Sequence, residues 1–152
     1  MTSQFVLRPI QNTDIEKNYL QLLSQLSPAN DINPTEYRDF LNFITLHPET
    51  YYIVVIVDAE SQTIVGTGTL LIEFKLIHHL GKVGHIEDIV IDDKYRGNGF
   101  GKMLIEHLKK RAEEMLCYKV ILNCNEDKVG FYTKCGFIKK GVEMRYNTNI
   151  IR

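Results

Sequence analysis

The sequence lacks the features that mark nucleic-acid-binding, membrane-spanning and secreted proteins. It has no basic excess, because 18 Lys and Arg stand against 19 Asp and Glu, for a formal net charge of −1. A general nucleic-acid binder is normally basic. The longest purely apolar run, residues 51–57, is far too short to cross a bilayer. The first residues, MTSQFVLRPI, carry no basic segment followed by an apolar core, so no signal peptide is expected.

Cysteine and histidine are few, and their spacing fits neither a disulfide framework nor a metal site. Cys117, Cys124 and Cys135 are odd in number and form no C-x-x-C motif. We interpret them as reduced thiols in a cytoplasmic protein. The five histidines show no zinc-ligand spacing, and no metal is expected.

The length and composition fit one globular domain. The chain has 152 residues, of which 44% are hydrophobic and 24% are charged. No internal repeat, low-complexity linker or domain boundary is visible, so we expect a single domain over residues 1–152.

Helical and strand periodicities alternate along the chain. Thr13 or Asp14 is a candidate N-cap for the first helix, Asn33 precedes Pro34 at the start of the second, and Gly136 follows the last. Helices are predicted over residues 15–26, 34–47, 102–115 and 127–135. Strands are predicted over residues 5–7, 51–57, 63–77, 83–91, 120–122 and within 137–146. Such an alternation favours a mixed sheet with helices packed on it.

The most informative stretch is YRGNGFGK, residues 95–102. It places Gly97, Gly99 and Gly101 between an apolar strand and a predicted helix. A helix N-terminus presents unpaired N–H groups and a partial positive charge, and glycines before it allow a ligand to approach the backbone. The pattern therefore predicts an anion site for phosphate or pyrophosphate.

Two familiar phosphate motifs do not match this turn. A P-loop would need glycine at position 96 and Ser or Thr at 103, where this chain has Arg96 and Met103. A Rossmann fingerprint starting at Gly97 would need glycine at position 102, which is lysine. A ligand-free strand-to-helix connection remains the alternative.

The spacing Arg96-x-x-Gly99-x-Gly101 is similar to the pyrophosphate loop of the GNAT superfamily of acetyl-CoA-dependent N-acetyltransferases. The segments GHIEDIVIDDKYRGNGFGKMLIEHL, CYKVILNCN, VGFYTKCGF and GVEM further resemble the glucosamine 6-phosphate N-acetyltransferase family. This resemblance covers Ser27 and most of residues 65–144. It implies an α/β (α+β) GNAT fold, in which helices flank a mostly antiparallel mixed sheet whose splayed central strands hold acetyl-CoA.

The same resemblance implies an activity and a set of site residues. The chain would acetylate D-glucosamine 6-phosphate from acetyl-CoA in UDP-GlcNAc biosynthesis, as a homodimer with shared sites. Catalytic roles would fall to Tyr132, Asn123, Glu87 and Asp88. The coenzyme would contact Ile89, Val90, Ile91, Arg96, Gly97, Asn98, Gly99, Phe100, Gly101, Lys102, Asn123, Tyr132 and Lys134. The acceptor would contact Ser27, Lys75, His78, Glu87, Asp88, Tyr118 and Lys119.

Tyr118 and Lys119 would reach the site of the partner subunit, and Lys128 would be a further coenzyme contact. Many relatives carry aspartate at the position of Asn123. The side chain of asparagine cannot accept a proton, so at this position the backbone carbonyl would orient the amine. Relatives also carry an arginine at the position of Asn147, two residues after Arg145.

Simple chemistry supports some of these assignments. Glu87 and Asp88 are adjacent in a strand, so their side chains should point to opposite faces. An amine with a pKa of about 8 is partly neutral at cellular pH, so direct attack on the thioester requires no strong base and no acetyl-enzyme. The phenol of Tyr132 would then assist the leaving thiolate.

Two other functions remain open. One is a GNAT enzyme for a different amine, such as a polyamine or a protein amine, and the other is a non-catalytic acetyl-CoA sensor. The basic residues Lys75, His78 and Lys119 favour a phosphosugar over a polyamine.

Overall fold

The computed structural model describes residues 4–150. The contacts divide the chain after Leu122 into two compact units, the second of which begins at Asn123. Within residues 4–150, no helix combines the length and hydropathy that a bilayer crossing requires.

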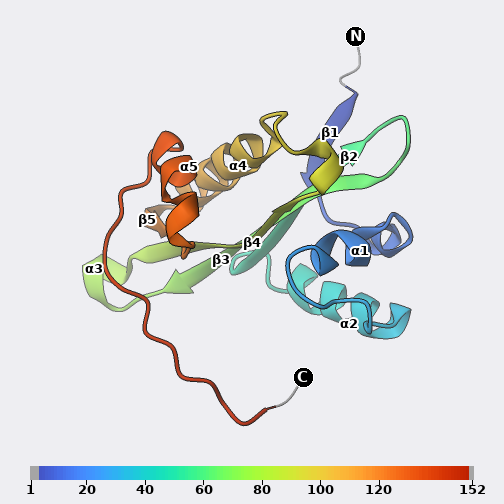
Figure 1. Cartoon of the computed structure of the whole chain (residues 1–152). Helices are drawn as coiled ribbons and strands as arrows, with labels where there is room; N and C mark the ends of the chain where they lie inside the picture. The colour runs from blue at the N-terminus through green and yellow to red at the C-terminus, as the bar shows by residue number, and fades with distance from the viewer. Residues whose placement is uncertain (1–3, 151–152) are drawn as a thin grey trace. The chain divides into compact units, whose positions relative to one another are not determined.

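The first unit is built on a five-stranded sheet with the order β1-β2-β3-β4-β5 (Figure 1). Its strands are β1 (Phe5–Pro9), β2 (Tyr51–Asp58), β3 (Ile64–Phe74), β4 (Lys82–Ile91) and β5 (Cys117–Ile121). Neighbouring strands from β1 to β4 are antiparallel, whereas β5 runs parallel to β4. The sheet is therefore mixed and mostly antiparallel, as expected.

Helices cover both faces of this sheet. The first unit contains η1 (Asn12–Glu16), α1 (Tyr19–Ser24), α2 (Pro34–Thr45), α3 (Ile77–Leu80), η2 (Asp93–Tyr95) and α4 (Phe100–Glu114). In Figure 1, α1 and α2 lie on one side of β3 and β4, and α4 lies on the other. Buried side chains of α1 and α2 form one core with the strands, which includes Leu22, Tyr37, Leu41, Ile44, Val55, Val57, Ile64 and Val90.

On the opposite face, α4 packs closely because the strands present glycine to it. A Cβ on Gly68 would lie 2.4 Å from Cδ1 of Ile89 and 3.1 Å from Cδ1 of Leu108. A Cβ on Gly84 would lie 3.2 Å from the Cβ of Ala112 in α4. A Cβ at Gly68 would displace the end of the Ile89 side chain, and one at Gly84 would require its neighbours to shift by a few tenths of an ångström.

The sequence predicts α2 and α4 well. Asn33 caps α2 by accepting hydrogen bonds from Thr35 N and Glu36 N, both at 3.0 Å, and the Glu36 side chain accepts from Asn33 N in return. This capping box and Pro34 at the first helical position account for the start of α2.

The first predicted helix is broken into η1 and α1. The break lies at Asn18, whose φ of 55° is left-handed and cannot continue a helix. Its side-chain oxygen instead accepts a hydrogen bond from Ile64 N at 3.2 Å. The predicted cap at Thr13 or Asp14 is also wrong, because Gln11 occupies the N-cap position of η1 and Asp14 lies three residues further.

The hairpin between β3 and β4 also differs from the prediction. The strand predicted to reach residue 77 ends at Phe74, because His78, His79 and Leu80 adopt left-handed φ values of 55°, 55° and 60°. Such residues cost free energy and occur mainly where the surrounding structure imposes them. The hairpin is closed by a hydrogen bond from Lys75 N to Gly81 O at 2.9 Å.

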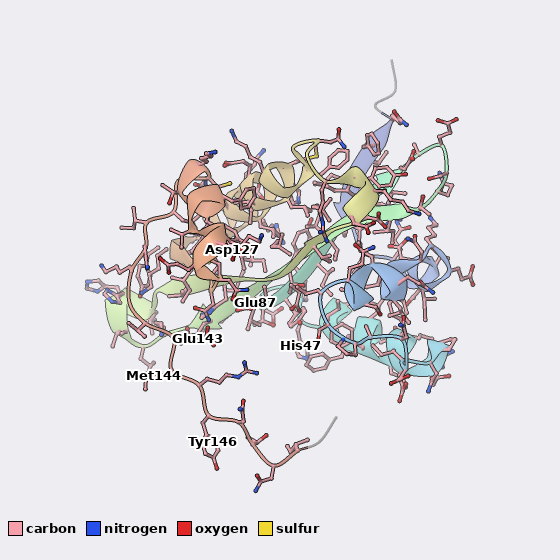
Figure 2. All side chains as sticks on the ribbon, viewed as in Figure 1. His47, Glu87, Asp127, Glu143, Met144 and Tyr146 are labelled. Carbon is pink, nitrogen blue, oxygen red and sulfur yellow. The ribbon has the colours of Figure 1, made fainter. Side chains whose placement is uncertain are left out.

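The second unit contains η3 (Glu126–Lys128) and α5 (Val129–Lys134), followed by an extended segment that carries Glu143, Met144 and Tyr146 (Figure 2). Gly136, with φ of 87°, ends α5 as the sequence predicts. The strand predicted within residues 137–146 is absent from the described part of this segment. Its alternating residues Val142, Met144 and Tyr146 are 87–91% exposed, and a strand forms only where a neighbouring strand pairs with it.

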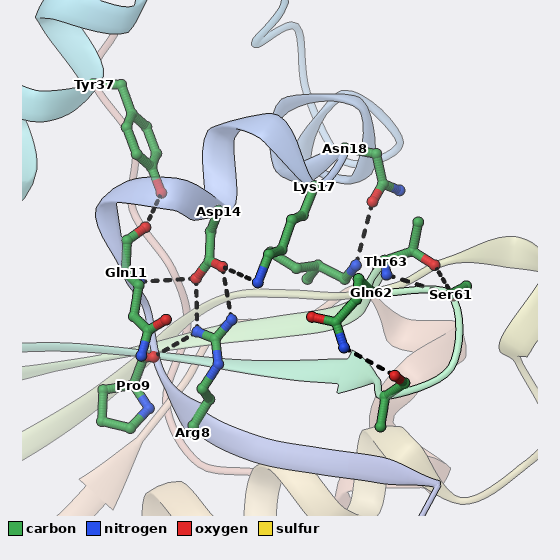
Figure 3. Close-up of polar contacts among 12 residues, drawn as sticks. Arg8, Pro9, Gln11, Asp14, Lys17, Asn18, Tyr37, Ser61, Gln62 and Thr63 are labelled. Carbon is green, nitrogen blue, oxygen red and sulfur yellow. Dashed lines mark hydrogen bonds and ion pairs between the residues drawn. The ribbon is translucent and has the colours of Figure 1, made fainter.

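A buried ion pair ties β1 to η1 (Figure 3). Asp14 is fully buried and accepts two hydrogen bonds of 2.7 Å from the guanidinium of Arg8, plus one of 2.8 Å from Gln11 N. These hydrogen bonds raise the pKa of Arg8. Lys17 is more distant, with Nζ 3.9 Å from Asp14 Oδ1.

Asp14→Ala should therefore lower the free energy of unfolding by about 3 kcal/mol, because it leaves a partly buried guanidinium without its partner. Urea unfolding of both proteins measures this difference. Lys17→Ala is the control and should cost less than about 1 kcal/mol, as a loose surface pair does. Equal losses in the two variants would contradict a central role for the Arg8–Asp14 pair.

Candidate active site

The site is organised by a bulge in β4. Thr67 of β3 pairs with Val90, but Thr69 pairs with Glu87, so Asp88 and Ile89 together oppose Gly68 alone. Asp88 takes a left-handed φ of 53° at this point. A bulge adds one residue to a strand, twists it and changes the direction of a side chain.

The bulge overturns the expectation that Glu87 and Asp88 point to opposite faces. Burial raises the pKa of Tyr51, and the charges of Asp88 and Glu87 raise it further, so both carboxylates lie near the same phenol. Glu87 also shares a face with its partner Thr69, which is the face that α1 and α2 cover. The two carboxylates thus form a pair on one side of the sheet.

Two tyrosines that sequence reasoning did not select lie close to this pair. Burial raises the pKa of Tyr19 to about 12, Asp88 contributes to the increase, and the hydroxyl lies 3.4 Å from Thr67 Oγ1. The ring of Tyr51 packs against Phe40 at 5.9 Å. Both phenols stay protonated at neutral pH and are possible hydrogen-bond donors beside the carboxylates. Their distance from the pair along the sequence explains why no local motif reveals them.

The backbone of β4 is open along one edge next to the carboxylates. β5 pairs with β4 only as far as His85, which lies opposite Ile121. Among the described residues, no strand pairs with Ile89, Val90 or Ile91 on that edge. Since Val90 is buried in the core, this stretch offers main-chain N–H and C=O groups more than side chains.

The glycine turn leads from β4 into α4. Gly97 and Gly99 both have φ of 81°, and a Cβ on either would meet nothing within 4 Å. Gly99 is the N-cap of α4, no side chain caps this helix, and its first turn has no acidic residue. The start of α2, in contrast, is capped by the side chains of Asn33 and Glu36. The first N–H groups of α4 thus have no side-chain cap, and the backbone before them is uncrowded, as an anion site requires.

The side chains in this turn mostly stabilise its own conformation. Arg96 Nε donates to Ile91 O at 3.1 Å, and Asn98 Nδ2 donates to Tyr95 O at 3.0 Å. Phe100 is buried and packs against Phe5 at 4.6 Å. The backbone is therefore the part of the turn that can meet a ligand, while Gly101 and Lys102 follow in the first turn of α4.

A second cluster forms where the β3–β4 hairpin meets β5. The rings of His78 and Tyr118 lie 4.6 Å apart, and Lys119 Nζ lies 5.4 Å from the centre of the Tyr118 ring. A hydrogen bond to Glu73 raises the pKa of Lys75, and Tyr118 adds to the increase. The structure thus brings four predicted acceptor residues together on one chain, namely Lys75, His78, Tyr118 and Lys119.

Ser27 lies elsewhere in the first unit. It follows α1, and nearby Gln25 donates to Asp92 Oδ2 at 3.3 Å and accepts from Asp93 N at 3.0 Å. These contacts hold the end of α1 beside the end of β4. Within one chain, Ser27 therefore lies near the end of β4 that leads into the glycine turn. The basic cluster, formed by Lys75, His78 and Lys119, lies at the hairpin where β4 begins.

The second unit carries the remaining candidates. Tyr132 on α5 packs between Phe131 and Phe137, with ring centres 5.0 and 6.1 Å away. Burial raises the pKa of its phenol, so the hydroxyl stays protonated. Asn123 and Lys134 are exposed, as is Lys128 at the C-terminal end of η3.

Arg145 Nε donates to Asn147 Oδ1 at 2.9 Å, so these two positions of interest contact each other. Across residues 4–150, no group of three His, Cys, Asp or Glu side chains could hold a metal ion.

Comparison with known proteins gives these features a context. The model of the acetyltransferase (GNAT) family matches residues 17–137. The chain is 41% identical over 137 residues to glucosamine 6-phosphate N-acetyltransferase 1 of Dictyostelium discoideum, which covers 90% of this chain and 87% of the relative. It is also 41% identical to glucosamine 6-phosphate N-acetyltransferase of Candida albicans, over 92% of this chain and 93% of the relative.

A solved structure agrees with these sequence relatives. The crystal structure of glucosamine-6-phosphate N-acetyltransferase from Arabidopsis thaliana superposes with a TM-score of 0.93 at 34% identity, covering 97% of this chain and all of that one. The family model spans most of the chain, and the identities extend over nine-tenths of it. The chain therefore belongs to the acetyltransferase (GNAT) family.

Proposed function

We propose that this chain transfers the acetyl group of acetyl-CoA to the amine of D-glucosamine 6-phosphate, which yields N-acetyl-D-glucosamine 6-phosphate and CoA. The relatives of this chain are named glucosamine 6-phosphate N-acetyltransferases, which supports glucosamine 6-phosphate as the acceptor. The observation that carries the proposal is the arrangement of β4, which offers a paired set of carboxylates at its bulge and an open backbone edge beside them.

Acetyl-CoA is the co-substrate that GNAT enzymes use. Its pyrophosphate would take the uncapped N–H groups of α4, with Lys102 as a nearby cation. Its peptide-like pantetheine arm would pair with the open edge of β4 at Ile89, Val90 and Ile91, in the manner of an added strand. Lys134 is proposed as a further coenzyme contact.

The acceptor has a cationic or neutral amine, several hydroxyls and a phosphate. Glu87 and Asp88 would accept hydrogen bonds from the amine and the hydroxyls. The basic cluster of Lys75, His78 and Lys119 would meet the phosphate, because cationic donors form the strongest hydrogen bonds with phosphate oxygens. Ser27 and Tyr118 are proposed as further acceptor contacts.

The reaction would be a direct attack within a ternary complex. A neutral amine held against the thioester gains much of its rate from proximity, so no acetyl-enzyme is needed. The carbonyl oxygen becomes an oxyanion, and an unpaired N–H on the open edge of β4 is suited to stabilise it. When the tetrahedral intermediate collapses, the C–S bond breaks and the thiolate of CoA leaves. The nitrogen loses its extra proton to water, so that the amide is neutral and one proton remains for the thiolate or for restoring the Tyr132 phenol.

Tyr132 is proposed to assist this departing thiolate. Because burial raises its pKa, the phenol keeps its proton and can donate a hydrogen bond to the sulfur or transfer the proton. Asn123 has no ionisable group, so its backbone carbonyl is proposed to orient the amine.

We further propose that both compact units act as one N-acetyltransferase domain, since the family model runs through the boundary at Leu122. A cytoplasmic homodimer with shared sites is proposed from the family resemblance. Tyr118 and Ile121 are 43% and 40% exposed on β5, at the edge of the sheet, which is consistent with a subunit contact there.

The activity is tested by release of CoA across a panel of amines. Glucosamine 6-phosphate should be preferred over glucosamine by at least tenfold in kcat/KM, because only the phosphorylated sugar engages the basic cluster. Spermidine and a lysine peptide serve as the competing acceptors. Preference for either would replace the proposed acceptor, and no turnover with any amine would leave a coenzyme sensor.

The glycine turn is tested by Gly99→Ala. The added Cβ lies where the pyrophosphate would contact the backbone, so the dissociation constant of acetyl-CoA measured by calorimetry should rise more than tenfold. Gly141→Ala is the matched control, because Gly141 has a similar φ of 77° and equally open surroundings. Both changes carry a similar backbone strain of about 1–2 kcal/mol. Equal coenzyme affinity in the two variants would indicate a purely structural turn.

Tyr132→Phe tests the proposed acid, because it keeps the ring and removes only the hydroxyl. We expect kcat to fall by about 10²–10⁴-fold with little change in either KM, as for loss of a positioned acid. Tyr37→Phe is the control, since it removes a hydroxyl that donates to Gln11 O at 3.0 Å. It should cost about 1 kcal/mol of stability and spare kcat. A less than threefold effect of Tyr132→Phe would make this residue a packing residue only.

A further inference from the structure

Glu73 bridges two basic side chains, Lys75 and His85, on the face of the sheet that carries the carboxylate pair. Its Oε1 accepts a hydrogen bond of 2.5 Å from Lys75 Nζ, and its Oε2 lies 2.9 Å from His85 Nε2. Neither Glu73 nor His85 has a role in the proposed site so far. Lys75, in contrast, is a proposed ligand of the acceptor phosphate.

The strand register explains how these side chains meet. Glu73 lies opposite Val83 and Leu71 lies opposite His85, so Glu73 and His85 are diagonal neighbours across β3 and β4. His85 precedes Glu87 by two residues on β4, which puts both side chains on one face. A polar row therefore runs from Lys75 through Glu73 and His85 toward Glu87.

Charge makes Glu73 a competitor within this row. Hydrogen bonds from Lys75 and then His85 lower the pKa of Glu73, and its own hydrogen bond raises the pKa of Lys75. Carboxylate and ammonium are therefore both charged at neutral pH, and Glu73 neutralises the cation that the phosphate needs. A phosphate beside Lys75 would also be repelled by the remaining carboxylate.

We infer that Glu73 competes with the ligand for Lys75: the phosphate of the acceptor must displace the Glu73 carboxylate from the Lys75 ammonium. This inference rests on the proposed function, because it takes Lys75 as a phosphate ligand. When the phosphate binds Lys75, Glu73 keeps His85 as its hydrogen-bond partner. A doubly charged phosphomonoester displaces a singly charged carboxylate, whereas a singly charged anion gains little. Glu73 thus determines specificity for a phosphomonoester group and limits how tightly it binds.

Glu73→Gln tests this directly, because glutamine has nearly the same shape and no charge. The KM for glucosamine 6-phosphate should fall about threefold to fivefold, a change of the size expected for an exposed ion pair. The KM for unphosphorylated glucosamine should stay within twofold. An increased KM for the phosphorylated sugar would overturn the inference, since it would make Glu73 a residue that positions Lys75 or contacts the sugar.

Glu106→Gln is the matched control for net charge. Glu106 forms another exposed ion pair, with its carboxylate 3.2 Å from Lys109 Nζ on α4. Removal of this charge should leave the KM for glucosamine 6-phosphate unchanged. An equal decrease in both variants would mean that overall charge sets the affinity, and the specific role of Glu73 would be wrong.

His85→Phe tests the second half of the exchange. Without His85 the displaced carboxylate has no partner, so the KM for glucosamine 6-phosphate should rise. The double variant Glu73→Gln/His85→Phe should match Glu73→Gln, because His85 acts only through Glu73. An additive effect in the double variant would overturn this link.

A binding experiment separates this inference from the proposed activity. If the wild-type chain fails to acetylate glucosamine 6-phosphate, the proposed function is wrong whatever Glu73 does. Calorimetric titration with inorganic phosphate then tests the competition by itself. Phosphate should bind Glu73→Gln more tightly than wild type, and Lys75→Ala should abolish the gain. Unchanged phosphate affinity in Glu73→Gln would refute the competition.

Discussion

The register of β4 against its two neighbours is the constraint on which the candidate site depends. On one side, the bulge at Asp88 turns two consecutive carboxylates to the same face. On the other side, β5 stops pairing at His85 and leaves the main chain of β4 open. Both effects act on the same few residues. A regular β4, paired along its whole length, would present one carboxylate to each face and no free backbone edge.

The glycines of the sheet and of the turn before α4 have two different structural roles. Gly68 and Gly84 leave room for their neighbours, because a Cβ at Gly68 would overlap the end of the Ile89 side chain and one at Gly84 would crowd Leu70 and Ala112. Gly97 and Gly99 have no such neighbour, and they are needed for a left-handed backbone that exposes the start of α4. Packing explains the first pair, whereas the second pair leaves open space before an uncapped helix, where we propose that an anionic ligand binds.

Two carboxylates on the α1–α2 face, Asp14 and Glu73, are each hydrogen-bonded to basic side chains. The buried Asp14 is satisfied by Arg8 and serves stability, while the more exposed Glu73 is shared between Lys75 and His85. The depth of burial separates these roles. A buried carboxylate cannot leave its partner without a large penalty, but an exposed one can exchange partners at small cost. Exposure is what makes Glu73 suited to competition with a ligand.

The sequence by itself determined the order of most elements, the cap of α2 and the glycine turn of residues 95–102 that leads into α4. These features depend on local rules of periodicity, capping and glycine conformation. It could not reveal the break at Asn18, whose side chain bonds to β3, or the unpaired state of residues 137–146, since both depend on partners distant in the chain.

Tertiary structure alone decided the geometry of the candidate site. Alternation along a strand predicts opposite directions for Glu87 and Asp88, and only the pairing with β3 shows the extra residue that reverses one of them. The contact of Glu73 with His85 likewise requires the register between two strands. Sequence spacing determines which residue types lie near the turn and the strand, but cross-strand register decides which of them meet, because side chains on neighbouring strands contact only when their strands are aligned.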